Sequence, residues 1–404
     1  MKIRIFVAVI ILAATHHLQV LAQTYDTNND VVQTFAGSGI PGYIDGQGQE
    51  TEFSNPSEIV ADTFGNLYVW DSGNRLIRRI TTNATVSTFI GGGTQLEGYG
   101  TNVSFSSYSS VGLIAIDHSN TIWTTASYVG FTYLLRITPD TYGLIENAGL
   151  SNLTTSSGLC FDSANNLYYS GGNRVYRYNP NTGISQVFVG SGVSGHLDGN
   201  GIFTEFSTPG ALVCDQADNI YVYDSAYLRK IDQAQNVTTI TNLFNGTPQA
   251  VDNTGNIIGV GGTSGTSYVF KLTTTTNFVL YAGTTSFSPG NYTNGPGNLA
   301  RFNTPSGACL SQGSIFVADS GNQRIRQISF NPQPQVISAG NLGFAMYPGV
   351  TITGIVGRTY QIQSSPDLNA WTPRGSILLT SSPFLWIDQN PVAGNQFYRA
   401  LLLP

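Results

Sequence analysis

The chain has 404 residues, of which only 10% are charged, and its formal net charge is −6. A chain of this length can bury a large hydrophobic core and is long enough for two domains. The low charge and the 46 glycines are typical of β-structure with many turns. The acidic balance argues against a nucleic-acid partner, because binding to a phosphate backbone depends on an excess of Lys and Arg.

The first residues have the pattern of a secretory signal. Lys2 and Arg4 form a basic start, Ile5–Ala14 is an apolar run, and Val20–Ala22 is a small-residue cleavage site. The apolar run is too short to span a bilayer, so no transmembrane segment is expected. We therefore expect residues 1–22 to be a signal peptide, cleaved after Ala22, and the mature protein to be secreted or held at the cell surface.

One four-residue motif recurs three times, as Asp45-Gly46-Gln47-Gly48, Asp198-Gly199-Asn200-Gly201 and Asn294-Gly295-Pro296-Gly297. A Phe stands eight residues after the first position of each copy, and a Pro stands eleven residues after it. A weaker copy begins at Glu97, which is 52 residues after Asp45. A period near fifty residues with strand-like content is typical of an array of propeller blades.

Within one repeat, short β-branched and aromatic runs alternate with turns rich in Asp, Asn and Gly. In the first repeat the predicted strands are Ser57–Ala61, Leu67–Trp70, Leu76–Ile80 and Val86–Ile90. Aligning the chain on this pattern gives six such units. We therefore expect an all-β fold, with a six-bladed β-propeller over residues 23–332.

The ring needs a strand that joins its two ends. Val31–Gly37 has the pattern of a fourth strand, like Gln186–Gly190, but no blade precedes it. Pairing it with the sixth blade would close the ring and remove two open sheet edges. Gln335–Ala339 is the alternative candidate for this strand.

The complete repeat resembles the NHL repeat. It consists of Asp-Gly-x-Gly, Phe-x-x-Pro, an apolar strand and then Gly-Asn-Leu/Ile-Tyr-Val-x-Asp-Ser-Gly-Asn-x-x-Ile-Arg-x-Ile. Phe53–Ile80 and Phe302–Ile328 carry it most completely, and the resemblance extends over about residues 31–330. Blades two, three and five lack the Asp that follows the second strand, and two of them have Gly171 and Gly261 there.

The composition changes near residue 333, where the repeat ends. Residues 333–404 contain five strand candidates separated by Pro, Gly, Ser and Asn, namely Val350–Ile355, Thr359–Gln363, Ile377–Thr380, Phe384–Asp388 and Gln396–Leu403. We expect a small C-terminal β-sandwich. Segments such as Gly357–Gln363 and Phe397–Arg399 resemble C-terminal modules of secreted bacterial proteins.

Carboxylates gather on one predicted face of the propeller. Because strands alternate in direction, the turns after second strands share this face with the connections from fourth to first strands. An acidic rim at the mouth of the channel would suit a hard cation such as Ca²⁺. The rim candidates are Asp45, Glu58, Asp71, Asp198, Asp224 and Asp319. The competing interpretation is that Asp-Gly and Asp-Ser-Gly-Asn are residues that tight turns require.

The basic residues are placed differently. The propeller has twelve, and eleven of them, all but Arg301, lie on or just before a third strand. Spread around the circumference in this way, they indicate a structural stripe and not a phosphate-binding patch.

No catalytic residues are expected from the sequence. After removal of the signal peptide only His118 and His196 remain, so a three-histidine zinc site is impossible. A Gly-x-Ser-x-Gly nucleophile elbow is also missing from the sequence. Cys160, Cys214 and Cys309 are expected as buried free thiols, because they belong to different blades and a disulfide needs closely placed partners.

Two functions of different class follow. The first is a secreted binding propeller that takes a protein or carbohydrate ligand at the channel face. The second, implied by resemblance to gluconolactonases and streptogramin lyases, is a calcium-dependent hydrolase or lyase in which Glu58 and Asn55 begin a metal-binding set. We favour binding, because no carboxylate of the second or third blade completes that set and a shared fold does not transfer activity.

Overall fold

A computed structural model describes residues 30–330 and 349–403, apart from short gaps within each range. These residues fall into two compact units, one in each range. Regular structure in the described residues is almost entirely β-strand. No helix in the described part of the chain is long and apolar enough to cross a membrane. The predicted signal peptide, residues 1–22, lies outside the described residues.

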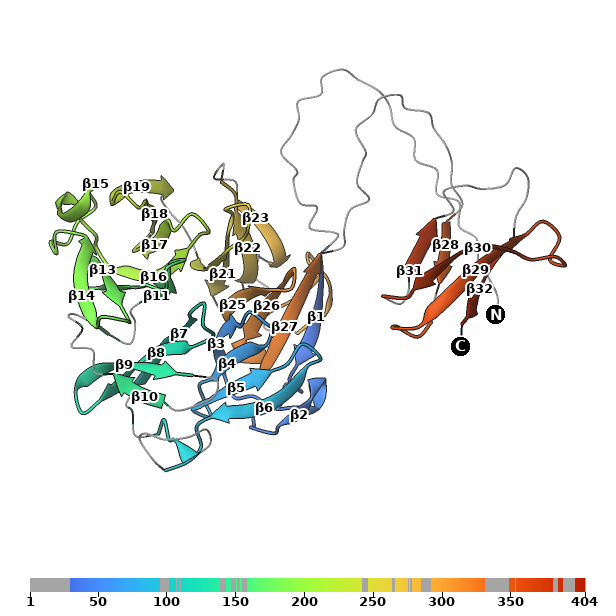
Figure 1. The fold of residues 1–404 in the computed structure, drawn as a ribbon, viewed down its shortest axis with the longest axis horizontal. Coiled ribbons are helices and arrows are strands. Elements are labelled where there is room, and N and C mark those ends of the chain that lie inside the picture. The colour runs from blue at the N-terminus through green and yellow to red at the C-terminus, as the bar shows by residue number, and fades with distance from the viewer. Residues whose placement is uncertain are drawn as a thin grey trace, which may run out of the picture. The chain divides into compact units, whose positions relative to one another are not determined.

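The described residues of the first unit form six antiparallel sheets around a common centre (Figure 1). From the inner to the outer strand, the first three sheets are β3 (Pro56–Ala61), β4 (Leu67–Asp71), β5 (Leu76–Ile80) and β6 (Thr85–Ile90); β7 (Ser110–Ile116), β8 (Ile122–Tyr128), β9 (Phe131–Ile137) and β10 (Gly143–Glu146); and β11 (Leu159–Phe161), β12 (Leu167–Gly171), β13 (Arg174–Asn179) and β14 (Ile184–Val189).

The remaining three sheets follow the same order, and the last one ends on a strand from the start of the chain. They are β16 (Pro209–Cys214), β17 (Ile220–Asp224), β18 (Tyr227–Ile231) and β19 (Asn236–Thr241); β20 (Thr247–Val251), β21 (Ile257–Thr263), β22 (Thr266–Leu272) and β23 (Phe278–Gly283); and β25 (Pro305–Ser311), β26 (Ser314–Asp319), β27 (Arg324–Phe330) and β1 (Asp30–Ala36).

The inner strands contact one another in chain order. β3 contacts β7, β7 contacts β11, β11 contacts β16, β16 contacts β20, β20 contacts β25, and β25 returns to β3. The six sheets therefore form a closed ring, and the prediction of a β-propeller is confirmed.

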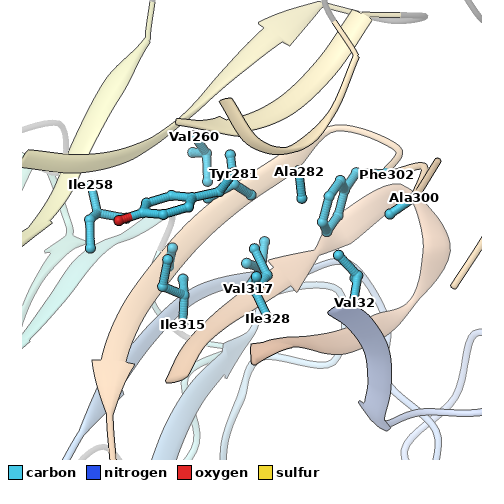
Figure 2. Packing of buried hydrophobic residues seen from close by; sticks show 12 residues of the cluster. Val32, Ile258, Val260, Tyr281, Ala282, Ala300, Phe302, Ile315, Val317 and Ile328 are labelled. Atoms are coloured by element: carbon cyan, nitrogen blue, oxygen red, sulfur yellow. The ribbon is translucent and has the colours of Figure 1, made fainter. Parts of the chain in front are cut away.

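The N-terminal strand closes this ring. β1 pairs antiparallel with β27, with Val32 opposite Ile328. Figure 2 shows Val32 packed in one core cluster with Phe302, Val317 and Ile328. The predicted pairing of Val31–Gly37 with the last blade is thus confirmed. The alternative strand, residues 335–339, lies outside the described residues.

Asp side chains fix the turn between the first two strands of a sheet. In the first sheet, Asp62 Oδ1 accepts hydrogen bonds from the backbone N–H groups of Phe64 (3.0 Å) and Asn66 (2.7 Å). The same bonds form at the equivalent Asp162 and Asp215. An Asp whose side chain replaces backbone partners in this way ends one strand and starts the next, so the strand bounds could be predicted closely.

The Asp-Gly motifs make short strands that the sequence did not predict. β2 (Gly46–Gln47), β15 (Gly199–Asn200) and β24 (Gly295–Pro296) pair with the outer strands β6, β19 and β1. Each motif therefore covers part of the exposed edge of a sheet before the chain returns to the inner strand. Covering an edge removes a site for unwanted strand pairing.

The second unit contains two small sheets. One pairs β28 (Gly349–Ile352) with β31 (Phe384–Ile387), and the other orders β30 (Thr372–Leu378), β29 (Thr359–Ser365) and β32 (Phe397–Leu402). Both sheets contribute to one hydrophobic cluster, in which the rings of Trp386 and Tyr398 lie 6.1 Å apart. Two sheets that share a core in this way are the arrangement expected of a small β-sandwich.

Candidate functional site

A buried arginine connects two of the rim candidates in the first sheet. Arg78, on β5, has no exposed side-chain surface. Its Nη2 lies 2.6 Å from Asp45 Oδ1, and its Nη1 lies 3.1 Å from Asp71 Oδ2. The guanidinium also donates to the carbonyl oxygens of Glu52 (2.9 Å) and Ile44 (3.2 Å). Arg78 thus binds two parts of the chain at once: the connection that contains Asp45, and Asp71 at the end of strand β4.

The same arrangement, which we call the Arg–Asp latch, recurs in the fourth and sixth sheets. In the fourth sheet, Arg229 Nη2 lies 2.8 Å from Asp198 Oδ1, and Arg229 Nη1 lies 3.3 Å from Asp224 Oδ2. In the sixth sheet, Arg326 Nη1 lies 2.8 Å from Asp319 Oδ2, and Arg326 Nη2 lies 2.9 Å from the Asn294 side-chain oxygen. Asn294 stands where the other two copies have Asp, and its amide oxygen accepts the equivalent hydrogen bond.

The latch also explains the Phe of the repeat. Each buried guanidinium lies over the ring of the Phe that follows the Asp-Gly motif by eight residues. The distances from the guanidinium carbon to the ring centre are 5.1 Å for Phe53, 4.7 Å for Phe206 and 5.1 Å for Phe302. A cation over an aromatic face is stabilised when both are shielded from water, so the spacing of Asp, Phe and Arg serves one structural unit.

The latch carboxylates also hold the backbone. Asp71 accepts hydrogen bonds from the Ser54 N–H (2.7 Å) and the Asn74 amide (2.7 Å). Burial raises the pKa of Asp71, although these hydrogen bonds and Arg78 act in the opposite direction. Burial raises the pKa of Asp319 against a similar set of partners.

Asp198 is the most exposed of the latch carboxylates whose pKa shifts. Burial alone would raise its pKa, but hydrogen bonds from Thr239 and Arg229 outweigh it, so the pKa is lowered. The Thr239 N–H lies 2.8 Å and the Thr239 hydroxyl 3.0 Å from this carboxylate. Five of the six rim candidates are therefore already bound by groups of the chain itself.

Glu58 is the exception among the rim candidates. It lies on the inner strand β3, opposite Trp70 of β4, and is half-buried. Its carboxyl group makes no hydrogen bond or ion pair with any residue that the structure describes. Its side chain keeps some contact with solvent. Loss of most of the water around the carboxyl group still disfavours its charged form and raises the pKa of Glu58 from its ordinary value of 4.5 to about 8.

No equivalent inner-strand position carries a second carboxylate. Glu58 stands four residues before the Asp62 turn, and the corresponding residues of the other sheets are Leu113, Gly158, Ala211, Pro248 and Gly307. Gly307 lies directly beside Glu58, since a Cβ atom added there would be 2.9 Å from the Glu58 Cα. The inner strands therefore present one acidic group among small and apolar residues.

The neighbours of Glu58 are fixed across the boundary between the first and sixth sheets. The Ser306 hydroxyl donates to the Ser57 carbonyl oxygen at 2.8 Å. The Asn55 N–H donates to the Gln323 side-chain oxygen at 2.6 Å. Asn55, the predicted companion of Glu58, is thus held from the sixth sheet in a left-handed conformation with φ of 52°.

The two histidines lie apart and are engaged elsewhere. His118 lies 2.9 Å from the Asn165 side-chain oxygen, and His196 stacks on Tyr227 with ring centres 3.7 Å apart. The described residues contain no group of three or more His, Cys, Asp or Glu side chains placed to hold a metal ion. Calcium binding at the rim stays a prediction.

The sequence interpretation missed that the rim candidates belong to two kinds. By composition the three latch arginines resemble the other basic residues of the third strands, and only their position, two residues before the Ile that ends the segment, distinguishes them. Burial separates them: Arg78, Arg229 and Arg326 are fully buried, whereas the neighbouring Arg79 is half-buried.

Comparison with known families and structures agrees with this fold. Residues 302–328 match the family model of the NHL repeat, so the prediction of an NHL-type β-propeller is confirmed in the segment that carries the pattern most completely. No curated protein is detectably similar to the chain in sequence.

Several solved structures share the propeller. A protein of unknown function from Bacteroides thetaiotaomicron is similar with a TM-score of 0.55 and 17% identity over 75% of this chain and 76% of that chain. An auxiliary nutrient binding protein from the same organism gives 0.52 and 18% over 74% and 76%. A protein of the same description from Bacteroides ovatus gives 0.50 and 14% over 75% and 77%. At these identities the likeness shows the fold alone.

Proposed function

We propose that this protein is an exported binding propeller, which takes a carbohydrate or protein ligand on the face that carries the Arg–Asp latches. Glu58 is the ligand-contacting residue in this proposal. The observation that carries it is the contrast between Glu58, which has no partner among the described residues, and the five other rim candidates, which are bound by neighbouring groups.

A half-buried carboxyl group without a partner costs stability unless a ligand or water supplies its hydrogen bonds. With a pKa near 8, Glu58 is mostly protonated at neutral pH, so its carboxyl group both donates and accepts hydrogen bonds. Such a group suits the hydroxyls of an uncharged carbohydrate. We therefore place carbohydrate before protein as the ligand class.

The comparisons are compatible with this proposal but do not carry it. Two of the similar solved structures are described as auxiliary nutrient binding proteins. They provide a precedent for ligand binding by a propeller of this kind. Since only the fold is shared, the chemistry of Glu58 is the argument for this chain.

The alternative is a calcium-dependent hydrolase or lyase. Ca²⁺ takes six to eight oxygen ligands in proteins, several of them carboxylates. In the described part of the chain, no other inner strand has a carboxylate at the position equivalent to Glu58, and the latch carboxylates are bound to arginines. The enzyme is therefore the less supported function.

The two functions are separated by one set of measurements on the purified protein. Bound metal is quantified, hydrolysis of lactones and esters is assayed with and without chelator, and binding to a panel of soluble polysaccharides is measured by calorimetry. Each is repeated with Glu58→Gln and with the control Glu50→Gln, an exposed residue beyond the Asp-Gly motif.

Saccharide binding that Glu58→Gln weakens at least tenfold and Glu50→Gln leaves unchanged would support the proposal. Chelator-sensitive turnover that is lost in Glu58→Gln would overturn it in favour of the enzyme. Binding that is identical in both variants would place the ligand elsewhere on the propeller.

A further inference from the structure

Two of the three cysteines meet between neighbouring sheets. Cys160 lies on β11 and Cys214 ends β16, and these inner strands contact each other. The two thiols belong to one hydrophobic cluster, and Cys160 contributes to the raised pKa of the Cys214 thiol. Cys309 lies in a different cluster, with β25. All three are free thiols in this structure.

The backbones of the two sheets approach closely beside these cysteines. A Cβ atom added at Gly158 would lie 2.3 Å from the Gly210 carbonyl oxygen and 2.5 Å from the Leu212 nitrogen, so only glycine fits there. The Ser170 hydroxyl bridges the same two strands, accepting from the Gly158 N–H at 2.9 Å and donating to the Gly210 carbonyl at 2.9 Å. Cys160 follows this contact by two residues.

Close approach of the backbones is the main geometric requirement of a disulfide, whose two Cα atoms lie about 4.4–6.8 Å apart. We propose that Cys160 and Cys214 form a disulfide between the third and fourth sheets when the chain folds in an oxidising compartment. The sequence argued against a pair because the cysteines belong to different blades. In a closed ring, however, the inner strands of successive blades are neighbours, so that argument fails.

The reaction needs an electron acceptor, which we take to be a disulfide, either glutathione disulfide or that of a thiol oxidoreductase. The thiolate of one cysteine attacks this disulfide, forms a mixed disulfide and releases one thiol. The thiolate of the second cysteine then attacks the mixed disulfide and releases the second thiol. The chain loses two protons and two electrons, and the acceptor is reduced to two thiols.

The environment of the thiols sets when this reaction occurs. Burial raises the pKa of Cys214 well above its ordinary value, so the reactive thiolate is rare in the folded ring. The exchange is therefore expected during folding, before the third and fourth sheets close on each other. In the folded protein both formation and reduction of the bond should be slow.

The test is to refold the full-length protein in a glutathione redox buffer, denature it and count its free thiols. One thiol per chain is expected, and three after reduction, because Cys309 is left unpaired. Peptide mapping of the same sample should yield a Cys160–Cys214 linked peptide. The oxidised protein should melt about 5–10 °C above the reduced one, since the bond closes a long loop of the unfolded chain.

Matched variants identify the pair. Cys309→Ser should leave no free thiol after oxidation and keep the melting difference. Cys160→Ser and Cys214→Ser should each leave two free thiols and lose the melting difference. Three free thiols in the oxidised wild-type protein, or a bond that involves Cys309, would overturn the proposal. Both results come from the wild-type protein and do not depend on the variants folding.

Discussion

Val32 and Ile328 face each other across an antiparallel strand pair, although one begins the propeller sequence and the other ends it. Both are completely or almost completely buried in the core shown in Figure 2. β1 also separates β27 from the short strand β24. The sixth sheet is therefore incomplete without the start of the chain, so the closed ring depends on a pairing between the two ends of the propeller sequence.

Deleting residues 23–37 should abolish cooperative unfolding of the propeller. The truncation removes Val32 from the core and leaves β27 as an open edge, which also favours aggregation. Calorimetry or circular dichroism during heating measures the effect. A deletion of residues 23–29 alone, which spares β1, is the control and should melt like the intact protein. Equal melting of the two truncations would contradict the closure.

Replacing Arg78 by Met should destabilise the propeller by about 3–5 kcal/mol, because Asp71 would be left buried without its cationic partner. The loss is measured by urea denaturation at neutral pH. Arg79→Gln is the control: Arg79 is the next residue on the same strand but half-buried. It should cost less than about 1 kcal/mol.

The double variant Arg78→Met with Asp71→Asn tests the same latch from the other side. If the penalty comes from an uncompensated buried charge, neutralising Asp71 should recover part of the loss, so the double variant is less destabilised than the sum of the singles. Strictly additive losses would mean that Arg78 acts through packing against Phe53 and not through the ion pair.

The pKa of Glu58 makes a prediction about stability. In the folded state this pKa is about 8 and in the unfolded state about 4.5, so between these values the folded protein holds a proton that the unfolded chain releases. Stability contributed by this group therefore falls as the pH rises from 4.5 to 8, and levels off above 8. Glu58→Gln stays neutral and avoids this loss.

The measurement is the difference in free energy of unfolding between Glu58→Gln and wild type as a function of pH. A pKa rise of this size would correspond to several kcal/mol in a dry interior, but solvent reaches Glu58, so we expect the variant to gain about 1–2 kcal/mol between pH 4.5 and pH 9. Glu50→Gln should show a constant difference. A flat profile for Glu58→Gln would mean that its pKa is not raised.

The strands could be predicted from the sequence because their ends are set by local contacts. Asp62 binds N–H groups two and four residues ahead, so its effect is visible in the sequence order. The latch could not be predicted in the same way. Asp45 lies 33 residues before Arg78, with three strands between them. Only the position of Arg78 within its strand distinguishes it from Arg79, and that position does not by itself show that its side chain is buried against Asp45.

The residues of the candidate site were harder still to predict from the sequence. Glu58 and Asp71 are carboxylates only thirteen residues apart, and the sequence treats them alike. One is bound to a buried guanidinium and the other has no partner in the described residues, and this difference depends on which side chains the ring brings beside them. The contact of Cys160 with Cys214 likewise depends on the order of blades around the ring.

The second unit should fold without the propeller. Ile352 from one sheet packs with Ile362 and Tyr398 from the other in a core that contains no propeller residue. Limited proteolysis is expected to cut near residues 331–334, where the repeat has ended, and to release a stable C-terminal fragment. That fragment, expressed alone, should show a cooperative thermal transition, while the propeller without it keeps its own melting temperature.

The control for this last prediction is Ile362→Asn, which places a polar group in the core of the second unit, where Ile362 is fully buried. It should remove the transition of the fragment and leave that of the propeller in the full-length protein unchanged. If the variant lowers both transitions together, or if no stable fragment survives proteolysis, the two units depend on each other. Independent folding would let the C-terminal unit act separately from the ligand face that we assign to the propeller.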